Sequence, residues 1–329
     1  MKKILFSIAL THVLVLYPLP LYFCTAADHG YFYQLINLIG SIQKHNFNEL
    51  VEIAVFDLGM LPDELHYLKN IQKISVHTVE LTHPNLLRPV RTQPLHISGM
   101  LSMHNYEMQN PGFLQNFIRR TWHKYVPGWY AWKPVIIKQA LDMFPYMLYI
   151  DAGTTVYGPL QDLFLYITEH NYFFHNGSPW CIKQEATHHV ITTFNLEAPQ
   201  NAWILDLHTQ GLEAGLMGLT RAMLQDFVLP MYELTKDLVH FEDDGTAHGK
   251  FGNSRHDLTL FSIIALQHNY TIHHHFKNPS EPCFLKTSKG IIPFHIACNK
   301  SDVQPYTIIY CSRKDIPELR DHIGYIRFK

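Results

Sequence analysis

The chain has 329 residues, of which 47% are hydrophobic, 13% are aromatic and 16% are charged. Its charged residues are fewer than the roughly 25% of a typical soluble domain, and this composition excludes a disordered chain. The formal net charge of −2 excludes a protein held to nucleic acid by phosphate contacts, because such a protein carries a strong basic excess. The composition therefore predicts a large folded core and no nucleic-acid partner.

The N-terminus has the pattern of a targeting segment. Two lysines precede an apolar run at 4–17, and Pro18 and Pro20 then end any helix. The run is shorter than the about 20 residues of a full membrane span. We expect residues 1–19 to be a signal peptide cut near the prolines or an uncleaved membrane anchor, rather than a buried helix. The protein is then exported or membrane-anchored (periplasmic, lumenal or secreted), with a cytoplasmic location as the alternative, and meets a membrane only through this segment.

The five cysteines form no Cys-x-x-Cys pair and show no zinc-ligand spacing. One disulfide among the last four would suit an exported protein. The alternative is that the cysteines are small buried hydrophobic side chains. The four in question are Cys181, Cys283, Cys298 and Cys311.

The first 80 residues alternate between strand and helix patterns. Apolar runs predict strands, whereas apolar residues that recur on one helical face predict helices. Asp28 is an expected helix N-cap. Short connections between such elements favour a parallel sheet with right-handed crossovers. The predicted strands are 21–25, 52–56 and 74–79, and the predicted helices are 31–45 and 61–68.

Residues 81–128 break this rhythm with five prolines and one predicted helix at 114–125. A long irregular segment inside a compact domain is usually a functional loop or a lid. The alternation then resumes, and Pro230 is expected to kink or divide the helix in which it lies. The later predictions are helices at 134–144, 158–168, 223–237 and 255–268, and strands at 146–150, 172–174, 270–274, 291–297 and 307–311.

The chemistry is expected at the end of the predicted strand 146–150. Ligands of a parallel sheet bind at the carboxyl ends of its strands, and Asp151 is the first residue beyond this strand. Gly153 allows a sharp turn there. A carboxylate in this place can hold a divalent cation that neutralises a diphosphate. The structural alternative is an aspartate that only caps the next turn.

Four segments, in the right order, resemble GT-A-type glycosyltransferases, which use nucleotide-diphospho-sugars. The sequence Tyr-Ile-Asp-Ala-Gly at 149–153, after the aromatic segment 129–134, resembles the family's strand that ends in an Asp-x-Asp motif. The turn at 25–28 is similar to the nucleotide-binding start. Segment 214–221 resembles the part that lines the sugar and acceptor side. Segment 253–257 resembles a late His-Asp-Gln element whose acid faces the donor sugar.

The resemblance implies a mainly parallel, mixed α/β sheet flanked by helices, with a small C-terminal β extension. It implies a single GT-A-like domain at 20–329 and a hexosyltransferase-like enzyme that moves a sugar from a nucleotide-sugar to a glycan or protein acceptor. The implied nucleotide and donor residues are Thr25, Ala26, Asp28, Lys133, Asp151 and Gly153.

The resemblance also implies residues nearer to the sugar. Asp257, or in second place Asp244, would act near the anomeric carbon as a base or sugar clamp. Asp257 also has capping-box spacing from Ser254, and Asp244 precedes a glycine as in an ordinary turn, so a structural role is the alternative for both. The sugar and acceptor side would include Trp132, Gly215, Gly218 and His256, and Trp132 belongs to an aromatic cluster suited to stacking or to core packing.

Two departures from the family pattern affect the expected chemistry. Gly153 stands where the second aspartate of the motif belongs, and Leu258 stands where the glutamine would follow Asp257. The implied cofactor, Mn²⁺ or Mg²⁺ at Asp151, would therefore have one ligand fewer and is left open. Without it, Lys133 is the nearest cation for the diphosphate. The alternative function is a non-catalytic carbohydrate- or nucleotide-binding protein with a degenerate metal site.

Overall fold

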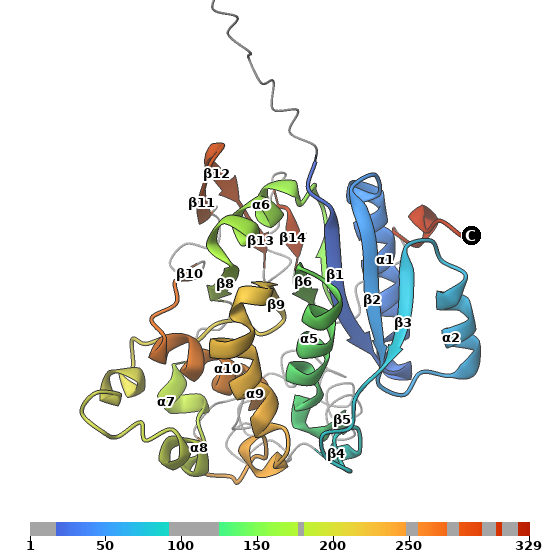
Figure 1. Cartoon of the computed structure of the whole chain (residues 1–329). Helices are drawn as coiled ribbons and strands as arrows, with labels where there is room; N and C mark the ends of the chain where they lie inside the picture. The colour runs from blue at the N-terminus through green and yellow to red at the C-terminus, as the bar shows by residue number, and fades with distance from the viewer. Residues whose placement is uncertain are drawn as a thin grey trace, which may run out of the picture.

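The computed structural model describes residues 18–91, 125–176, 181–247, 256–274, 283–297, 307–310 and 322–329. Its centre is a seven-stranded sheet with the order β10-β8-β9-β6-β1-β2-β3 (Figure 1). Strands β6, β1, β2 and β3 run parallel, β9 is antiparallel to both β6 and β8, and β10 is parallel to β8. The strands are β1 (Leu21–Ala27), β2 (Leu50–Asp57), β3 (Ile74–Thr78), β6 (Tyr146–Ile150), β8 (Tyr172–Asn176), β9 (Leu216–Thr220) and β10 (Ile272–His274).

Helices cover both faces of this sheet and create two separate cores. One core joins α5 (Trp132–Met143), α9 (Leu229–Leu234) and α10 (His256–Gln267) to one face. The other joins α1 (Phe32–Asn46), α2 (Pro62–Lys69) and α6 (Gln161–His170) to the opposite face. Residues 256–265 of α10 are all buried, as expected of a helix that is apolar all round. The prediction of a mixed, mainly parallel sheet flanked by helices is confirmed.

Most sequence-predicted elements agree with the structure to within a few residues. Asp28 caps a short 3-10 helix, η1 (His29–Tyr31), through a 3.0 Å hydrogen bond that Tyr31 N donates to its carboxylate. The predicted helix at 223–237 is divided, because Pro230 lacks an N–H and crowds the preceding turn. A π-helical turn (Leu224–Val228) stands before α9 and accommodates the proline.

Sequence reasoning missed five strands among the described residues, of which two have five residues and three have two or three. Strand β9 is an uninterrupted apolar run with Gly218 at its centre, a pattern that is not specific to a strand. Strand β11 (Cys283–Thr287) alternates buried and exposed residues and pairs with β12 (Gly290–Phe294) in an antiparallel hairpin. A second small sheet contains β13 (Ile296–Ala297), β14 (Ile309–Tyr310) and β7 (Thr155–Val156). Together they form the predicted C-terminal β extension.

The predicted irregular segment contains a two-stranded ladder, β4 (Pro89–Arg91) with β5 (Tyr125–Pro127). The predicted helix at 114–125 lies almost wholly outside the described residues. After β5, Gly128 has φ +46°, and a Cβ there would stand 1.9 Å from the Leu86 carbonyl oxygen. Only glycine allows the backbone at residue 128 to come this close to that of Leu86. This close contact fixes the start of the aromatic segment that follows.

The structure covers only part of the predicted N-terminal segment and only some of the cysteines considered for a disulfide. Residues 1–17 lie outside the described part of the chain, and no helix within that part is long and apolar enough to cross a membrane. The further small helices include α7 (Ile182–Glu185), which packs against α10, and α8 (His188–Thr193) and η3 (Ala202–Leu205). Cys24, Cys181 and Cys283 are buried and unbonded to one another, whereas Cys298 and Cys311 lie outside the described residues.

Candidate active site

Three of the predicted site residues, Lys133, Asp151 and Asp257, meet near the carboxyl ends of β1 and β6. The two strands are parallel, with Cys24 opposite Tyr149. Ala26 and Asp151 each come two residues after this pair in the sequence. Strand β9 runs the other way, so its first residues meet the same edge, where Asp151 N donates a 2.9 Å hydrogen bond to Gly215 O. The reversed strand therefore brings together Asp151 and Gly215, which are 64 positions apart in the sequence.

Lys133 is the centre of the site. Its ammonium lies 2.7 Å from Oδ2 of Asp257 and 3.4 Å from Oδ1 of Asp151, and donates a 3.2 Å hydrogen bond to Ala214 O. The side chain of Lys133 is 5% exposed and that of Asp257 is 8% exposed, whereas 42% of Asp151 is exposed. Helix α5, the end of β6 and the start of α10 thus meet at one buried cation, with a single carboxylate open to solvent.

The electrostatics of this cluster keep Lys133 charged. Burial acts to lower the pKa of its ammonium, but the carboxylates of Asp151 and Asp257, with Glu213 farther away, outweigh burial and raise the pKa above its usual value. Tyr149 donates a 2.5 Å hydrogen bond to Oδ1 of Asp151. Burial, together with the negative Asp151, raises the pKa of the Tyr149 hydroxyl well above its usual range, so that it remains a donor.

Aromatic rings surround the ammonium. It lies 5.2 Å from the ring centre of Tyr149, 5.9 Å from that of Tyr130 and 6.0 Å from that of Trp132. These distances are those of cation–π contacts, which are worth more when the cation is desolvated. Trp132 is 5% exposed, so its ring packs in the core beside Lys133.

Gly215 leaves a gap between two carboxylates. A Cβ at this residue would stand 2.9 Å from Oδ2 of Asp151 and 3.3 Å from Oε1 of Glu213. Glu213 is 7% exposed, and its Oε1 also accepts a 3.3 Å hydrogen bond from Gly215 N. Sequence reasoning missed Glu213 because it precedes a strand that was not predicted. The available signal was that Glu213 directly precedes the segment 214–221, which resembles the sugar and acceptor side.

His256 opens α10 next to Asp257 and is held by a hydrogen bond and by ring contacts. Its Nδ1 donates a 2.7 Å hydrogen bond to Phe241 O, and its ring lies 4.9 Å from that of Trp129. His256, Trp129 and Tyr130 have φ values of +45°, +54° and +64°, which are unusual for residues other than glycine. Such backbone strain tends to cluster at functional sites, because only a surrounding structure that over-determines it can hold it.

The other predicted residues belong to strands and turns of the fold. Gly153 belongs to the turn after Asp151, in which Thr154 N donates to Asp151 O at 3.0 Å, and the carboxylate of Asp28 caps η1. The side chain of Thr25 is fully buried within β1. Gly218 packs against Ile167 inside the sheet.

Asp244 serves a turn in the structure. Its carboxylate accepts hydrogen bonds from the backbone N–H and hydroxyl of Thr246, at 2.9 Å and 2.5 Å, and from the backbone N–H of His189. Although burial acts to raise its pKa, these bonds lower it. Asp244 therefore stabilises a turn, which is the structural alternative that the sequence analysis gives for it. The contacts of Asp244 do not join those of Lys133.

Solved structures with similar folds include several glycosyltransferases, the class that the sequence resemblance implies. Core-mannan synthase A from Aspergillus fumigatus, in an Mn/GDP form, has 10% identity and a TM-score of 0.46 over 80% of this chain and 73% of that chain. Mouse xyloside xylosyltransferase 1 has 13% identity and a TM-score of 0.44 over 91% and 99%. The mannosyltransferase Ktr4p from S. cerevisiae, in complex with GDP, has 10% identity and a TM-score of 0.44 over 91% and 76%.

No protein-family model matches the chain, and no curated protein matches its sequence. Because the identities and TM-scores of the solved structures are low, their likeness decides neither donor nor acceptor. The strand order and the site geometry carry the functional argument.

Proposed function

We propose that this protein is a glycosyltransferase that moves a sugar from a nucleotide-diphospho-sugar to a glycan or protein acceptor. The observation that carries the proposal is the carboxylate of Asp151, partly exposed at the end of a central strand and ion-paired with the buried Lys133. A ligand approaching this edge of the sheet meets Asp151 first. Asp151 would orient the ribose and diphosphate, and Lys133 would balance charge on the leaving group.

The charges of the cluster support a divalent cation as a second neutralising group. Asp151, Asp257 and Glu213 surround one ammonium, so a bound diphosphate would add negative charge to a site that already has an excess of it. No group of three or more His, Cys, Asp or Glu side chains that could hold a metal occurs within the described residues. Mg²⁺ and similar ions are nevertheless often held by one or two carboxylates together with substrate phosphates.

The residues beside Gly215 fit this kind of shared site. Oδ2 of Asp151 and Oε1 of Glu213 both lie next to the space that a Cβ on Gly215 would fill. We propose that they hold Mn²⁺ or Mg²⁺ jointly with the donor, although Gly153 contributes no carboxylate to it. When bound, the ion would neutralise charge on the diphosphate. The chain's own residues would orient the donor and keep Lys133 in place.

Other residues divide between the two ends of the donor. Ala26 and Asp28 would flank the nucleotide, with Thr25 supporting them from within β1. Asp257 would act at the sugar end as a base or clamp, because it contacts Lys133 directly, whereas Asp244 is committed to a turn. His256 would contribute to the same end, with Trp132 and Gly218 supporting it from the core.

The Asp151→Ala variant tests this proposal. It removes an exposed carboxylate and should abolish sugar transfer without unfolding the protein. The matched control is Asp162→Ala, another partly exposed acid, which lies on α6. Transfer and donor hydrolysis would be measured with a panel of nucleotide-sugars, and melting temperature would report folding. Full activity in Asp151→Ala would refute the assignment.

Gly153 favours a second candidate, a non-catalytic carbohydrate- or nucleotide-binding protein, because it removes one acid of the motif. A thermal-shift screen of UDP, GDP and CDP with and without Mn²⁺ shows whether the protein binds a nucleotide, since a ligand that binds the folded state raises the melting temperature. Nucleotide binding without turnover of any donor would favour the second candidate.

A further inference from the structure

The β11–β12 hairpin has an unusually apolar outer face. The register pairs Phe284 with Pro293 and Lys286 with Ile291, so these four side chains share one face of the hairpin. Phe284 is 62% exposed and Ile291 is 71% exposed. The inner face is buried against the core that includes α6. The hairpin therefore presents an aromatic and an aliphatic side chain to the surroundings.

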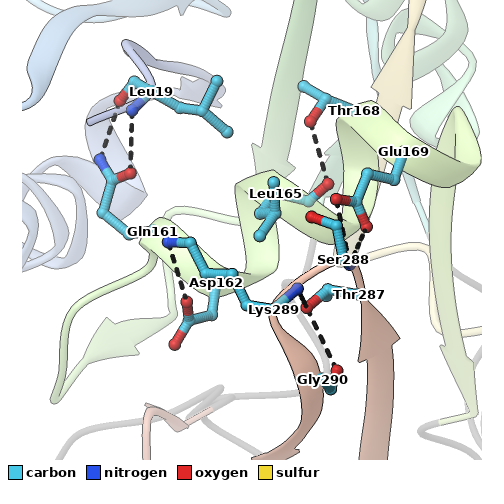
Figure 2. A network of polar contacts seen from close by, with 10 residues as sticks. All are labelled: Leu19, Gln161, Asp162, Leu165, Thr168, Glu169, Thr287, Ser288, Lys289 and Gly290. Atoms are coloured by element: carbon cyan, nitrogen blue, oxygen red, sulfur yellow. Dashed lines mark hydrogen bonds and ion pairs between the residues drawn. The ribbon is translucent and has the colours of Figure 1, made fainter. Parts of the chain in front are cut away.

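The same helix, α6, holds both this hairpin and the start of the described chain (Figure 2). Leu19 N donates to Oε1 of Gln161 at 3.1 Å, and Nε2 of Gln161 donates to Leu19 O at 2.8 Å. The next residue, Asp162, lies 4.0 Å from the ammonium of Lys289 at the hairpin tip. Gln161 and Asp162, which are adjacent in α6, thus contact Leu19 and the hairpin tip, respectively.

The hairpin is also anchored at the other end of α6. Ser288 N donates to both carboxylate oxygens of Glu169, at 3.2 Å and 2.9 Å. The hairpin tip is thereby fixed along α6 by contacts at both ends of the helix. Its outer face is consequently a defined surface of the fold with a fixed orientation relative to Leu19.

This surface lies at the end of the sheet opposite to the candidate active site. Strand β1 begins at the same end of the sheet as the hairpin, and its seven residues lead to the opposite end (Figure 1). At about 3.3 Å per residue, the strand spans roughly 23 Å. The apolar run at 4–17 joins the fold just before Leu19, at the hairpin end.

We propose that the outer face of the β11–β12 hairpin rests on the lipid bilayer next to the N-terminal segment. Aromatic and aliphatic side chains combined with lysines are typical of membrane–water interfaces. Lys286 and Lys289 are offset by Asp162 and Glu169 on α6, so the contact depends on apolar burial and does not require anionic lipid. The contact turns the candidate active site away from the bilayer. This inference is independent of the proposed sugar transfer.

The first experiment places a fluorescent label on the hairpin. The full chain carrying Ile291→Cys, labelled with nitrobenzoxadiazole, is mixed with phosphatidylcholine vesicles. Its emission should shift to the blue and be quenched by lipid-borne nitroxides. The matched control is Leu81→Cys, at a leucine that is 61% exposed and lies beyond the carboxyl end of β3. That label should keep a water-like emission.

Three results would overturn the proposal. They are water-like emission from both labels, a chain that stays in the supernatant when the vesicles are sedimented, and a label at position 291 whose emission shifts equally without vesicles. The last result would indicate that the label is buried by self-association of the chain. Wild type treated with the same thiol-reactive label corrects for reaction at the native cysteines.

A second experiment measures the strength of the contact. The double variant Phe284→Ser/Ile291→Ser changes two exposed residues and should fold normally. It should lower the vesicle partition coefficient of the full chain about tenfold or more, because burying an apolar side chain contributes at least that factor. Leu81→Ser should leave partitioning unchanged, and the effect should be insensitive to salt. Equal partitioning of the double variant and wild type would contradict the inference.

Discussion

The ammonium of Lys133 and the carboxylate of Asp257 form a 2.7 Å ion pair between the first turn of α5 and the first turn of α10. Both side chains are almost fully buried. Desolvating two charges is costly, and their attraction offsets this cost only when the geometry is good and further hydrogen bonds are made. Ala214 O and Asp151 supply these further contacts. The pair therefore links the stability of the fold to the geometry of the candidate site.

Replacing Lys133 should affect both stability and activity. Lys133→Met leaves Asp257 as a buried charge without its cation, and such a change typically costs about 3–5 kcal/mol of unfolding free energy. We expect a loss of this size in denaturant unfolding and a fall in sugar transfer on the order of 100-fold or more.

The double variant Lys133→Met/Asp257→Leu separates the two effects. With both charges removed, stability should recover most of the loss, whereas transfer should stay abolished. A single variant as stable as wild type would show that the ion pair is not needed by the fold. A double variant that is active would remove both residues from the proposed chemistry.

Gly215→Ala should impair activity more than stability. The new Cβ would stand 2.9 Å from Oδ2 of Asp151 and has to displace this exposed carboxylate. We expect at least a tenfold loss of transfer and weaker Mn²⁺ binding, measured by titration calorimetry, in a protein that still folds. Gly324→Ala is the control, because a Cβ there meets nothing within 4 Å. Unchanged Mn²⁺ binding by Gly215→Ala would argue against a metal beside this residue.

Tyr149→Phe tests how Asp151 is positioned. The variant removes the 2.5 Å hydrogen bond to Oδ1 of Asp151 and keeps the ring that contacts Lys133. A hydrogen bond to a charged group is worth about 1.5–3 kcal/mol, so we expect up to that loss of stability or of transition-state binding. A lower kcat with little change in the donor KM, together with an altered pH profile, would identify a positioning role. An effect on melting temperature alone would leave Tyr149 a purely structural residue.

His175 should make the protein sensitive to acid. Burial lowers the pKa of this fully buried histidine from 6.5 to about 4 in the folded state. The unfolded chain takes up the proton near pH 6.5, so stability is independent of this group above that pH and declines as pH falls toward 4. The loss is on the order of 3 kcal/mol for a shift of this size. Denaturant unfolding at pH 7.5 and 4.5 measures it.

A matched pair of variants tests the assignment of this acid sensitivity. His175→Gln should reduce the difference in unfolding free energy between the two pH values, whereas His208→Gln, at an exposed histidine, should not. If His175→Gln keeps the full pH dependence, other groups are responsible for the acid sensitivity.

Local patterns were sufficient for most of the central sheet. The strand before Asp151 and helix α10 are marked by apolar runs, helix α1 by apolar residues on one face, and helix α5 by the proline in its first turn; all of these signals act over a few positions. Strand β9 was missed because a short apolar run with a central glycine has no periodicity that distinguishes it. The π-helical turn before Pro230 was beyond prediction for another reason: packing decides whether a proline divides or bends a helix.

The sequence by itself determined that an α/β sheet forms and that Asp151 stands at the end of one of its strands, because strand alternation and turn chemistry depend on near neighbours. Only the tertiary structure decided which charges meet. Lys133, Glu213 and Asp257 belong to segments 44 to 124 residues apart, and the reversal of β9 beside β6 brings Glu213 to the site. The membrane-facing role proposed for the β11–β12 hairpin depends on tertiary packing in the same way, since contacts with α6 hold both the hairpin and Leu19.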